Sequence, residues 1–246
     1  MNLYLKMSIS RRLALAWCGT AALALAASAQ ANLVSNGGFE TTSTGGGQLG
    51  YNTTAAGWST TGYNFVFPAG TADAPGVAGS LGLVQLWGPN NGSANGLTAT
   101  SPDGGNYLAA SADYNVGAIS QTITGLTVGD VYHLTFDYAA AQQQGFFGDT
   151  TVKWSVTLGD QTLDTDLLAN PSLGFTGWRE ATLDYTATST TETLSFLASG
   201  SLPVLPFALL DGVDLEPAVT PEPSTMALAA LGLGGMVAAR RRALAK

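Results

Sequence analysis

The chain has almost no cysteine, and this absence removes several kinds of chemistry. Cys18 is the single cysteine among 246 residues, and it lies in an apolar stretch near the amino terminus. Disulfides, thiol catalysis and cysteine metal sites are therefore excluded for the rest of the chain. A domain of this length can bury a core large enough to fold without disulfides.

Basic residues are scarce between residues 32 and 220. This stretch has Lys153 and Arg179 against sixteen aspartates and glutamates, a formal net charge of two minus sixteen, or −14. Nucleic-acid binding depends on clustered Lys and Arg that neutralise phosphates, so that class of function is set aside. An acidic surface suits divalent cations and keeps a protein soluble.

The residues available for catalysis are also few. His133 is the single histidine, and it falls within an expected strand rather than in a loop. The Gly-x-Ser-x-Gly motif of a nucleophile elbow does not occur in the sequence. A glycan hydrolase needs only two carboxylates, but no pair stands out among the many acids. We therefore expect a protein that is not an enzyme, with a glycan hydrolase as an alternative.

The first thirty-one residues have the three parts of a secretory signal peptide. Basic residues precede an apolar helical run over 13–27, and small residues follow. Cleavage after Ala31 is preferred to cleavage after Ala29, because the next residues begin to resemble a folded domain. The alternative is an uncleaved membrane anchor, but the apolar run is shorter than the ~20 residues that a span needs.

The carboxyl end has a Pro-Glu-Pro motif, then an apolar stretch over 226–239, then an arginine cluster. The residues of the motif and the cluster are Pro221, Glu222, Pro223, Arg240, Arg241 and Arg242. The arginines would stay at the cytoplasmic face of a membrane. As a helix, the apolar stretch reaches only ~21 Å, short of a ~30 Å hydrocarbon core. This shortfall favours a processed signal over a permanent transmembrane helix.

The order and spacing of these features resemble the PEP-CTERM sorting family, over about a tenth of the chain. The resemblance implies recognition by a membrane-embedded exosortase in a Gram-negative bacterium that makes extracellular polysaccharide. It also implies transient contact with the inner membrane, processing near the Pro-Glu-Pro motif, and delivery to the cell envelope, outer surface or extracellular matrix. We expect 217–246 to be this sorting segment. An ordinary tail anchor with incidental prolines is the alternative.

Residues 32–216 form one expected domain, rich in Gly, Thr, Ser and Asn and without a long helical run. Alternation is plainest over 132–138, where every second residue is large and apolar. About ten short strands with Gly-rich turns predict an all-β fold, a jelly-roll β-sandwich. The expected strands are 33–40, 57–67, 81–87, 106–110, 118–124, 132–138, 151–158, a short one through Leu163, 178–187, 192–198 and 207–215.

Turn signals refine this picture at two places. The strands over 118–124 and 132–138 are separated by a Gly-rich turn, so we expect them to pair as an antiparallel hairpin. The stretch 70–105 is rich in Pro, Asn and Gly, so we expect long loops over one end of the sandwich. Such loops are where a binding site usually lies.

The opening segment 32–40 and the closing segment 209–215 resemble those of galactose-binding-like sandwiches, a group that includes several carbohydrate-binding modules. The resemblance implies that the first and last strands lie close together. It also assigns Glu40 and Asp211 to a structural calcium site, since calcium prefers several oxygen ligands. The alternative is that both acids accept hydrogen bonds from backbone donors at strand ends.

Carbohydrate binding would use exposed aromatic rings helped by amide hydrogen bonds. Gln143, Phe146 and Phe147 follow a strand in an expected loop, and Trp87 precedes a Pro-Asn-Asn-Gly turn. These four are the candidate ligand-binding residues. Three other tryptophans fit strand patterns and are expected in the core, namely Trp58, Trp154 and Trp178.

The sequence therefore predicts an exported, exosortase-sorted protein of the cell surface or extracellular matrix. We expect it to be associated with exopolysaccharide, as in a biofilm. A specific carbohydrate-binding module and a glycan hydrolase are the two alternatives. A matrix protein would show no saturable ligand, a binding module would be retained selectively on one polysaccharide, and a hydrolase would release products from it.

Overall fold

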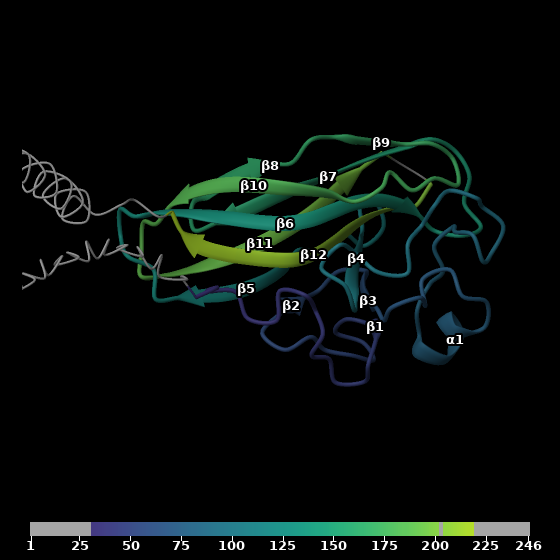
Figure 1. Ribbon diagram of the computed structural model, residues 1–246, viewed down its shortest axis with the longest axis horizontal. Helices are drawn as coiled ribbons and strands as arrows, with labels where there is room; N and C mark the ends of the chain where they lie inside the picture. Colours follow the sequence, from purple (N-terminus) through teal and green to yellow (C-terminus); the bar gives the residue numbers. More distant parts are fainter. Residues whose placement is uncertain (1–30, 202–203, 219–246) are drawn as a thin grey trace, which may run out of the picture.

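The computed structural model describes residues 31–201 and 204–218. The expected signal peptide up to residue 30 and the expected helix over 226–239 lie outside these residues. The described residues form two antiparallel sheets packed face to face, which confirms the predicted all-β sandwich (Figure 1). Helix α1 (Val77–Leu81) is short, and no helix in the described part of the chain is long and apolar enough to cross a membrane.

The first sheet has the strand order β1-β3-β4-β12-β6-β10. Its strands are β1 (Gly47–Gln48), β3 (Asn64–Phe67), β4 (Tyr107–Ser111), β12 (Pro206–Pro217), β6 (Val131–Gln142) and β10 (Arg179–Thr186). The two central long strands, β12 and β6, pair along most of their length.

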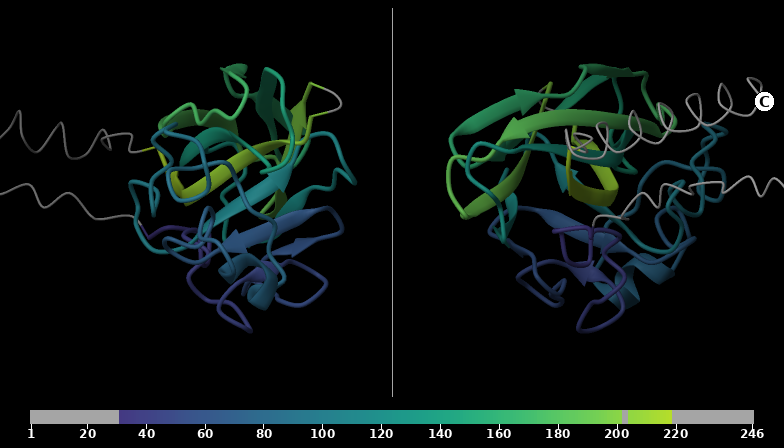
Figure 2. Two further views of the ribbon diagram at one scale, coloured as in Figure 1. Left: turned by 90° about the vertical axis from the view of Figure 1, so that its right-hand side faces the viewer. Right: turned by 60° about the vertical axis from the view of Figure 1, so that its left-hand side comes forward.

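The second sheet has the order β2-β5-β11-β7-β8, and β9 also pairs with β7. Its strands are β2 (Ser59–Thr60), β5 (Ile119–Thr124), β11 (Thr191–Gly200), β7 (Thr150–Leu158), β8 (Gln161–Asp164) and β9 (Leu168–Asn170). Several pairs of strands that follow one another in sequence, such as β5 and β6 or β11 and β12, lie in different sheets. This crossing between the two layers is the arrangement of a jelly roll (Figure 2).

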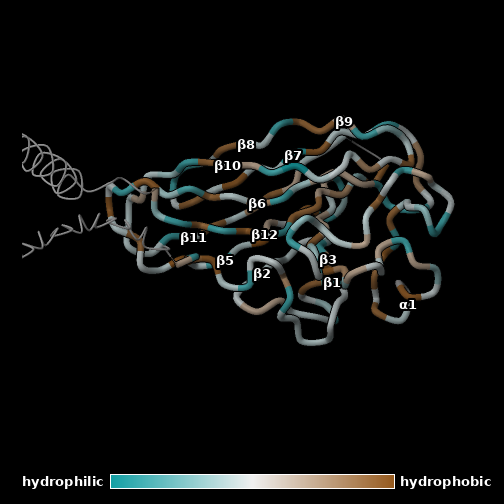
Figure 3. The backbone as a smooth tube through the Cα atoms, viewed as in Figure 1, coloured by the Kyte–Doolittle hydropathy of each residue, from teal (hydrophilic) through white to brown (hydrophobic). Residues whose placement is uncertain are grey.

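Large apolar side chains from both sheets fill the space between them. Along β7, and along β6 from Val131 to Tyr138, every second side chain is buried, as the alternating sequence predicts. Figure 3 shows hydrophilic and hydrophobic residues following one another along the strands. Trp154 on β7 is 1% exposed, and its Nε1 donates a hydrogen bond to the Leu209 carbonyl of β12 at 3.0 Å. The Tyr185 hydroxyl of β10 likewise donates to the Val156 carbonyl of β7 at 2.8 Å. Both bonds join the two sheets.

A second apolar cluster covers the outer face of the first sheet. Residues of β3, β4, β6 and β12 that point away from the main core contact Leu83, Leu86 and Leu97 from the stretch 70–105. Burial on both faces explains why 139–141 and 207–210 are continuous apolar runs rather than alternating ones. Trp178 is half-buried against this cluster, whereas Trp58 and Trp154 lie in the main core as expected.

The two ends of the described chain lie together. The Leu33 amide donates to the Leu215 carbonyl at 3.0 Å, and the Leu215 amide donates to Asn32 Oδ1 at 3.1 Å. The opening segment thus lies against the last strand, at the pole of the sandwich opposite to α1 (Figure 1). This proximity agrees with the expectation for the first and last segments.

Several expected strands and pairings are wrong. The strands over 118–124 and 132–138 form no hairpin, because β5 pairs with β2 and β11, whereas β6 pairs with β10 and β12. The turn between them crosses from one sheet to the other. The segment 33–40 bends at Asn36 and Phe39, which have positive φ. The expected strand over 81–87 begins with the last residue of α1 and continues as a loop with one bridge between Leu86 and Gln143. The expected strand over 57–67 is broken into β2 and β3.

The Trp154→Ala substitution tests the contact between the sheets. It removes the largest fully buried side chain and its bond to Leu209, so we expect the free energy of unfolding to fall by ~3–5 kcal/mol in urea. Leu167→Ala is the control, because Leu167 is 61% exposed and should change stability by less than ~0.5 kcal/mol. Equal effects of the two substitutions would contradict this account of the core.

Candidate functional site

Two aromatic rings from distant segments meet at the loop-covered end of the sandwich. The rings of Trp87 and Phe147 have centroids 5.6 Å apart and planes tilted by 54°. The Phe147 side chain is 62% exposed, whereas Trp87 is half-buried. Trp87 Nε1 donates to the Phe146 carbonyl at 2.9 Å, so the indole is held in one orientation against the loop 143–149. The arrangement is a fixed indole beside an open phenyl ring.

Backbone hydrogen bonds hold the two segments side by side. The Trp87 amide donates to the Gln142 carbonyl at 2.9 Å, and the Gln144 amide donates to the Gln85 carbonyl at 2.8 Å. The Gln144 side-chain amide also donates to the Asn91 carbonyl at 3.2 Å. The segments 85–91 and 142–147 therefore behave as one extended pair, which carries both rings.

A buried glutamine ties further loops to this pair. Gln142 is 0% exposed, and its Oε1 accepts from the Leu173 amide at 2.7 Å. Its Nε2 donates to the carbonyls of Gly148 and Val204, each at 3.1 Å. One side chain thus fixes three loops at this end, a role that its position in an apolar strand did not reveal.

The structure brings the four sequence-predicted residues to one place. Phe146, Phe147 and Gln143 lie on the loop, and Trp87 lies beside them. The Gln143 Oε1 atom is buried without a hydrogen-bond partner among the described residues, so it faces the protein rather than solvent. Their part in ligand binding stays a prediction, for which Phe147 and Trp87 have the suitable exposure and geometry.

A second site lies on the outer face of the first sheet, where β12 has a bulge. Asp211 is 0% exposed, its Oδ2 accepts a hydrogen bond from the Ser101 hydroxyl, and its Oδ1 has no partner in the described chain. Glu40 Oε1 accepts from the Asn106 amide at 2.7 Å. If no calcium is bound, both acids should accept hydrogen bonds from backbone donors. Glu40 does so, but Oδ1 of Asp211 has no hydrogen-bond partner in the described chain.

Glu40 and Asp211 approach each other around Gly38. A Cβ atom on Gly38 would lie 3.8 Å from Asp211 Oδ1, 3.8 Å from Glu40 Cγ and 2.9 Å from Asp103 Oδ2. Sequence reasoning missed Asp103, because nothing in the Asp-Gly-Gly turn at 103–105 shows which strand the turn will reach. The carboxylates of Asp103 and Asp211 thus approach each other at Gly38, and that of Glu40 lies beside Gly105.

The pKa of Asp211 reflects this setting. Burial raises the pKa from 3.8 to about 8, the Ser101 hydroxyl and the Gly212 backbone amide oppose this rise, and the neighbouring carboxylates of Asp103 and Glu40 add to it. Within 31–201 and 204–218, no three His, Cys, Asp or Glu side chains are arranged as a complete metal site. A cation here would therefore need carbonyl or water oxygens in addition to the carboxylates.

More acids continue along the same face. Asp103, Asp137, Glu180 and Asp214 line a cavity of about 210 Å³ beside Gly212, whose φ of 56° permits the bulge of β12. The pKa of Asp137 is raised by burial and by the Glu180 and Asp103 carboxylates. Burial likewise raises the pKa of Asp214, with a contribution from Glu216. Negative charge is concentrated on this side of the molecule.

His133 lies on this outer face, far along β6 from the aromatic rings. Its Nδ1 is 2.5 Å from Asp184 Oδ1 on β10, and both side chains are largely exposed. Gln142 lies nine positions after His133 on β6, which corresponds to ~30 Å along a strand. The histidine therefore forms a surface hydrogen bond with Asp184 and cannot act at the aromatic site.

Residues 219–242 match the model of the PEP-CTERM protein-sorting motif. The matched segment contains the Pro-Glu-Pro motif and the arginine cluster, which lie outside the described residues. The motif indicates export, exosortase-dependent sorting and a place at the bacterial cell surface. No curated protein matches the chain in sequence.

Solved structures with a similar course of the chain are distant. TmCBM61 in complex with β-1,4-galactotriose is 16% identical, covers 76% of this chain and 99% of its own, and has a TM-score of 0.41. The CBM22-1 xylan-binding domain of Paenibacillus barcinonensis Xyn10C is 14% identical over 79% of this chain and 99% of its own, with a TM-score of 0.38. The enzymatically active domain of bacteriophage CBA120 tailspike protein 4 is 14% identical over 76% of this chain and 21% of its own, with a TM-score of 0.37. Similarity at this level says nothing about what the chain binds.

The raised pKa of Asp211 predicts a pH-dependent stability in the absence of divalent cations. Between pH 3.8 and about 8 the folded state keeps a proton that the unfolded chain releases, so the free energy of unfolding falls as pH rises. The contribution of this one group is at most ~1.4 kcal/mol per pH unit. Asp211→Asn is neutral at every pH and should show a shallower decline.

Urea unfolding with a chelator present, at intervals from pH 4.5 to 7.5, measures this difference. The gap between Asp211→Asn and the unaltered protein should widen in favour of the variant as pH rises. Parallel stability curves would show that Asp211 does not retain its proton in the folded state.

Proposed function

We propose that the domain over 32–216 is a non-catalytic carbohydrate-binding module, which associates a surface-sorted protein with extracellular polysaccharide. The observation that supports this proposal is the exposed ring of Phe147 packed beside the fixed indole of Trp87. Aromatic rings provide a large, rigid contact surface, and a sugar presents an apolar face of C–H groups that can stack on it. The ligand is a glycan of the cell's own matrix or of a surface that the cell contacts.

The rings are held before any ligand arrives. Trp87 is fixed by its Nε1 bond to Phe146 and by the Asn95 side-chain amide, which donates to the Trp87 carbonyl at 2.8 Å. A preorganised site loses little conformational entropy on binding, which favours affinity. The side-chain amide of Gln144 donates to the Asn91 carbonyl and that of Asn91 donates to the Leu86 carbonyl, so these bonds further fix the loops around the rings.

The position of the rings suits a surface protein. The chain leaves the sandwich after Ala218 at one pole, and the loops that carry Trp87 and Phe147 lie at the other (Figure 1). When the carboxyl-terminal segment is engaged by an exosortase at the inner membrane, the aromatic pole is directed away from that attachment. The final location that we propose is the outer surface or the extracellular matrix of a Gram-negative bacterium.

Phe147→Ala should weaken binding to the cognate polysaccharide by about tenfold or more, a change of ~1.4 kcal/mol. Tyr51→Ala is a matched control, because Tyr51 is 82% exposed and belongs to another part of the molecule. Affinity gel electrophoresis against a panel of bacterial polysaccharides provides the readout. Unaltered migration of the native protein in every gel would indicate a structural matrix protein without a saturable ligand, and release of reducing ends would indicate a hydrolase.

We also propose a structural calcium ion at Glu40 and Asp211. The unpartnered buried Oδ1 of Asp211 fits this proposal, since a buried carboxylate oxygen needs a hydrogen bond or a cation. Asp103 supplies a further carboxylate oxygen beside Gly38, and the carboxylate oxygens of Glu40 lie beside Gly105 in the adjoining turn. The ion would join the opening segment, the 101–106 turn and β12, so its role would be to stabilise the fold.

Calcium should raise the melting temperature of the chelator-treated protein. Binding to the folded state alone stabilises it by ~2.7 kcal/mol at a free concentration a hundred times Kd. Glu40→Gln and Asp211→Asn should lose this response, whereas Asp160→Asn, in the exposed turn between β7 and β8, should keep it. If neither calcium nor a chelator changes the melting temperature of the native protein, the proposed calcium site is wrong.

A further inference from the structure

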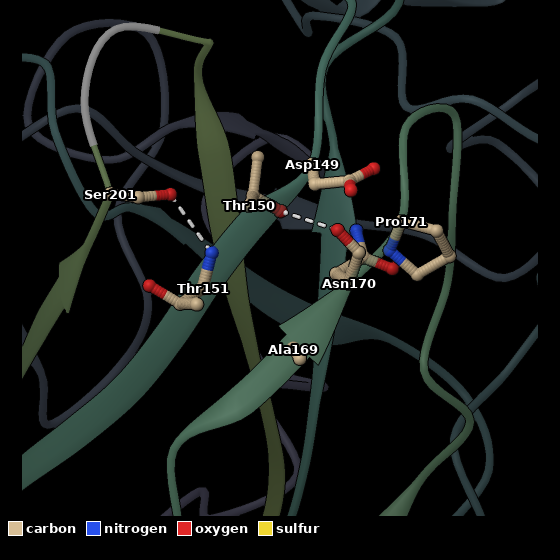
Figure 4. Close-up of a pocket in the computed structure, with 7 residues that line it drawn as sticks. All are labelled: Asp149, Thr150, Thr151, Ala169, Asn170, Pro171 and Ser201. Carbon is tan, nitrogen blue, oxygen red and sulfur yellow. Dashed lines mark hydrogen bonds between the residues drawn. The ribbon is translucent and has the colours of Figure 1, made fainter.

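A cavity with both polar and apolar lining lies beside the loop that carries Phe147. It has a volume of about 360 Å³ and is bordered by the beginning of β7, the end of β9 and the residue after β11 (Figure 4). Asp149, Thr151, Asn170 and Ser201 contribute its polar lining. This volume is within the ~300–1,000 Å³ range of small-molecule sites.

Internal hydrogen bonds fix the walls of the cavity. The Thr151 amide donates to Ser201 Oγ at 2.9 Å, and the Ser201 amide donates to the Thr151 carbonyl at 3.0 Å. The Thr150 hydroxyl donates to the Asn170 carbonyl at 3.3 Å, and the Ser172 amide donates to Asp149 Oδ1 at 3.0 Å. Each of the three segments is therefore bonded to a neighbour.

Hydrogen-bonding capacity remains after these bonds. In the described part of the chain, no partner is recorded for Asp149 Oδ2 or for the Thr151 hydroxyl, and the Ser201 hydroxyl only accepts. Two hydroxyls that can donate or accept and one carboxylate oxygen that accepts are complementary to adjacent hydroxyl groups of a sugar.

The cavity adjoins the aromatic rings through a rigid loop. Phe147 and Asp149 are two residues apart, so their Cα atoms are at most ~7 Å from each other. Gly148 lies between them. Its amide donates a hydrogen bond to Ser172 Oγ at 2.8 Å, and its carbonyl accepts one from Gln142 Nε2. A chain of sugar units is the kind of ligand that can contact both places at once.

Charge restricts the kind of sugar. The only basic residues between 31 and 218 are Lys153, which pairs with Asp164, and Arg179 on β10. Asp149 is exposed at the cavity, so a uronate, sulfate or phosphate group would meet negative charge without a compensating cation. A hydroxyl or an amine would be accepted.

We propose that this cavity is a second subsite of the glycan site, which binds the unit next to the one on Phe147 and selects neutral or amino sugars over uronates. The inference rests on the proposed carbohydrate-binding function. It specifies that an oligosaccharide of at least two units is needed to occupy the whole site, and that this oligosaccharide is neutral or positively charged.

Isothermal titration calorimetry with the purified exported protein tests the second subsite. The probes are neutral β-1,4-linked gluco-, galacto- and xylo-oligosaccharides of one to four units, a chitosan oligosaccharide and a polyuronate oligosaccharide. Thr151→Val and Asp149→Asn remove hydrogen-bonding or charge while keeping shape, and Thr157→Val on the same strand is the control. Melting temperatures verify that each variant is folded.

The native protein should bind at least one neutral or amino-sugar probe of two or more units, and no polyuronate. Thr151→Val and Asp149→Asn should each weaken the binding of these longer probes by about tenfold and equalise their affinity with that of the single sugar. Phe147→Ala should weaken every length. Asp149→Lys should admit the polyuronate.

Two results separate the subsite from the function on which it rests. Native-like binding of all lengths by Thr151→Val and Asp149→Asn, with loss of binding in Phe147→Ala, would overturn the second subsite and leave the carbohydrate-binding function intact. Failure of the native protein to bind any neutral or amino-sugar probe would overturn both. Tight binding of the polyuronate by the native protein would overturn the charge selection.

Discussion

The burial of both faces of the first sheet is the constraint on which the rest of the structure depends. β12 pairs with β4 on one side and β6 on the other, and its residues alternate between the main core and the outer cluster. Leu209 faces the outer cluster while its carbonyl receives the Trp154 hydrogen bond from the opposite sheet. The same strand then carries Asp211 and the bulge at Gly212. Core, loop cover and acidic site therefore share one strand.

The aromatic rings depend on that outer cluster. Because Ala139 and Ala141 have small side chains on the outer face, the stretch 70–105 can lie directly on the sheet and bury Leu86. Leu86 bridges to Gln143, and the next residue, Trp87, is thereby placed against Phe147. Packing of a loop on a sheet, rather than a helix or strand, positions the proposed binding surface. The acidic sites follow from the same cover, since the 101–106 turn brings Asp103 and Ser101 to β12.

Sequence reasoning predicted the elements whose signal is local. Alternation identified β6 and β7 with the correct inward faces, and the resemblance of 32–40 and 209–215 to known sandwiches placed Glu40 near Asp211. It failed where a contact depends on which layer a strand joins. A Gly-rich turn can join two strands of one hairpin or two strands in different sheets, so the predicted pairing of β5 with β6 is wrong. The roles of Asp103 and Gln142 could not be predicted because their partners are distant in sequence. The contact between Trp87 and Phe147 could not be predicted either, because the sequence shows only that both residues are aromatic.

The central claim is that a sugar stacks on the open ring beside Trp87. Intermolecular nuclear Overhauser effects, measured on the complex with whichever neutral oligosaccharide the protein retains, test this claim directly. The account predicts contacts between the Phe147 ring protons and the C–H face of one sugar unit, together with a shift of the Trp87 indole resonance. Saturable binding whose contacts all lie elsewhere, with the Phe147 and Trp87 resonances unchanged, would contradict it.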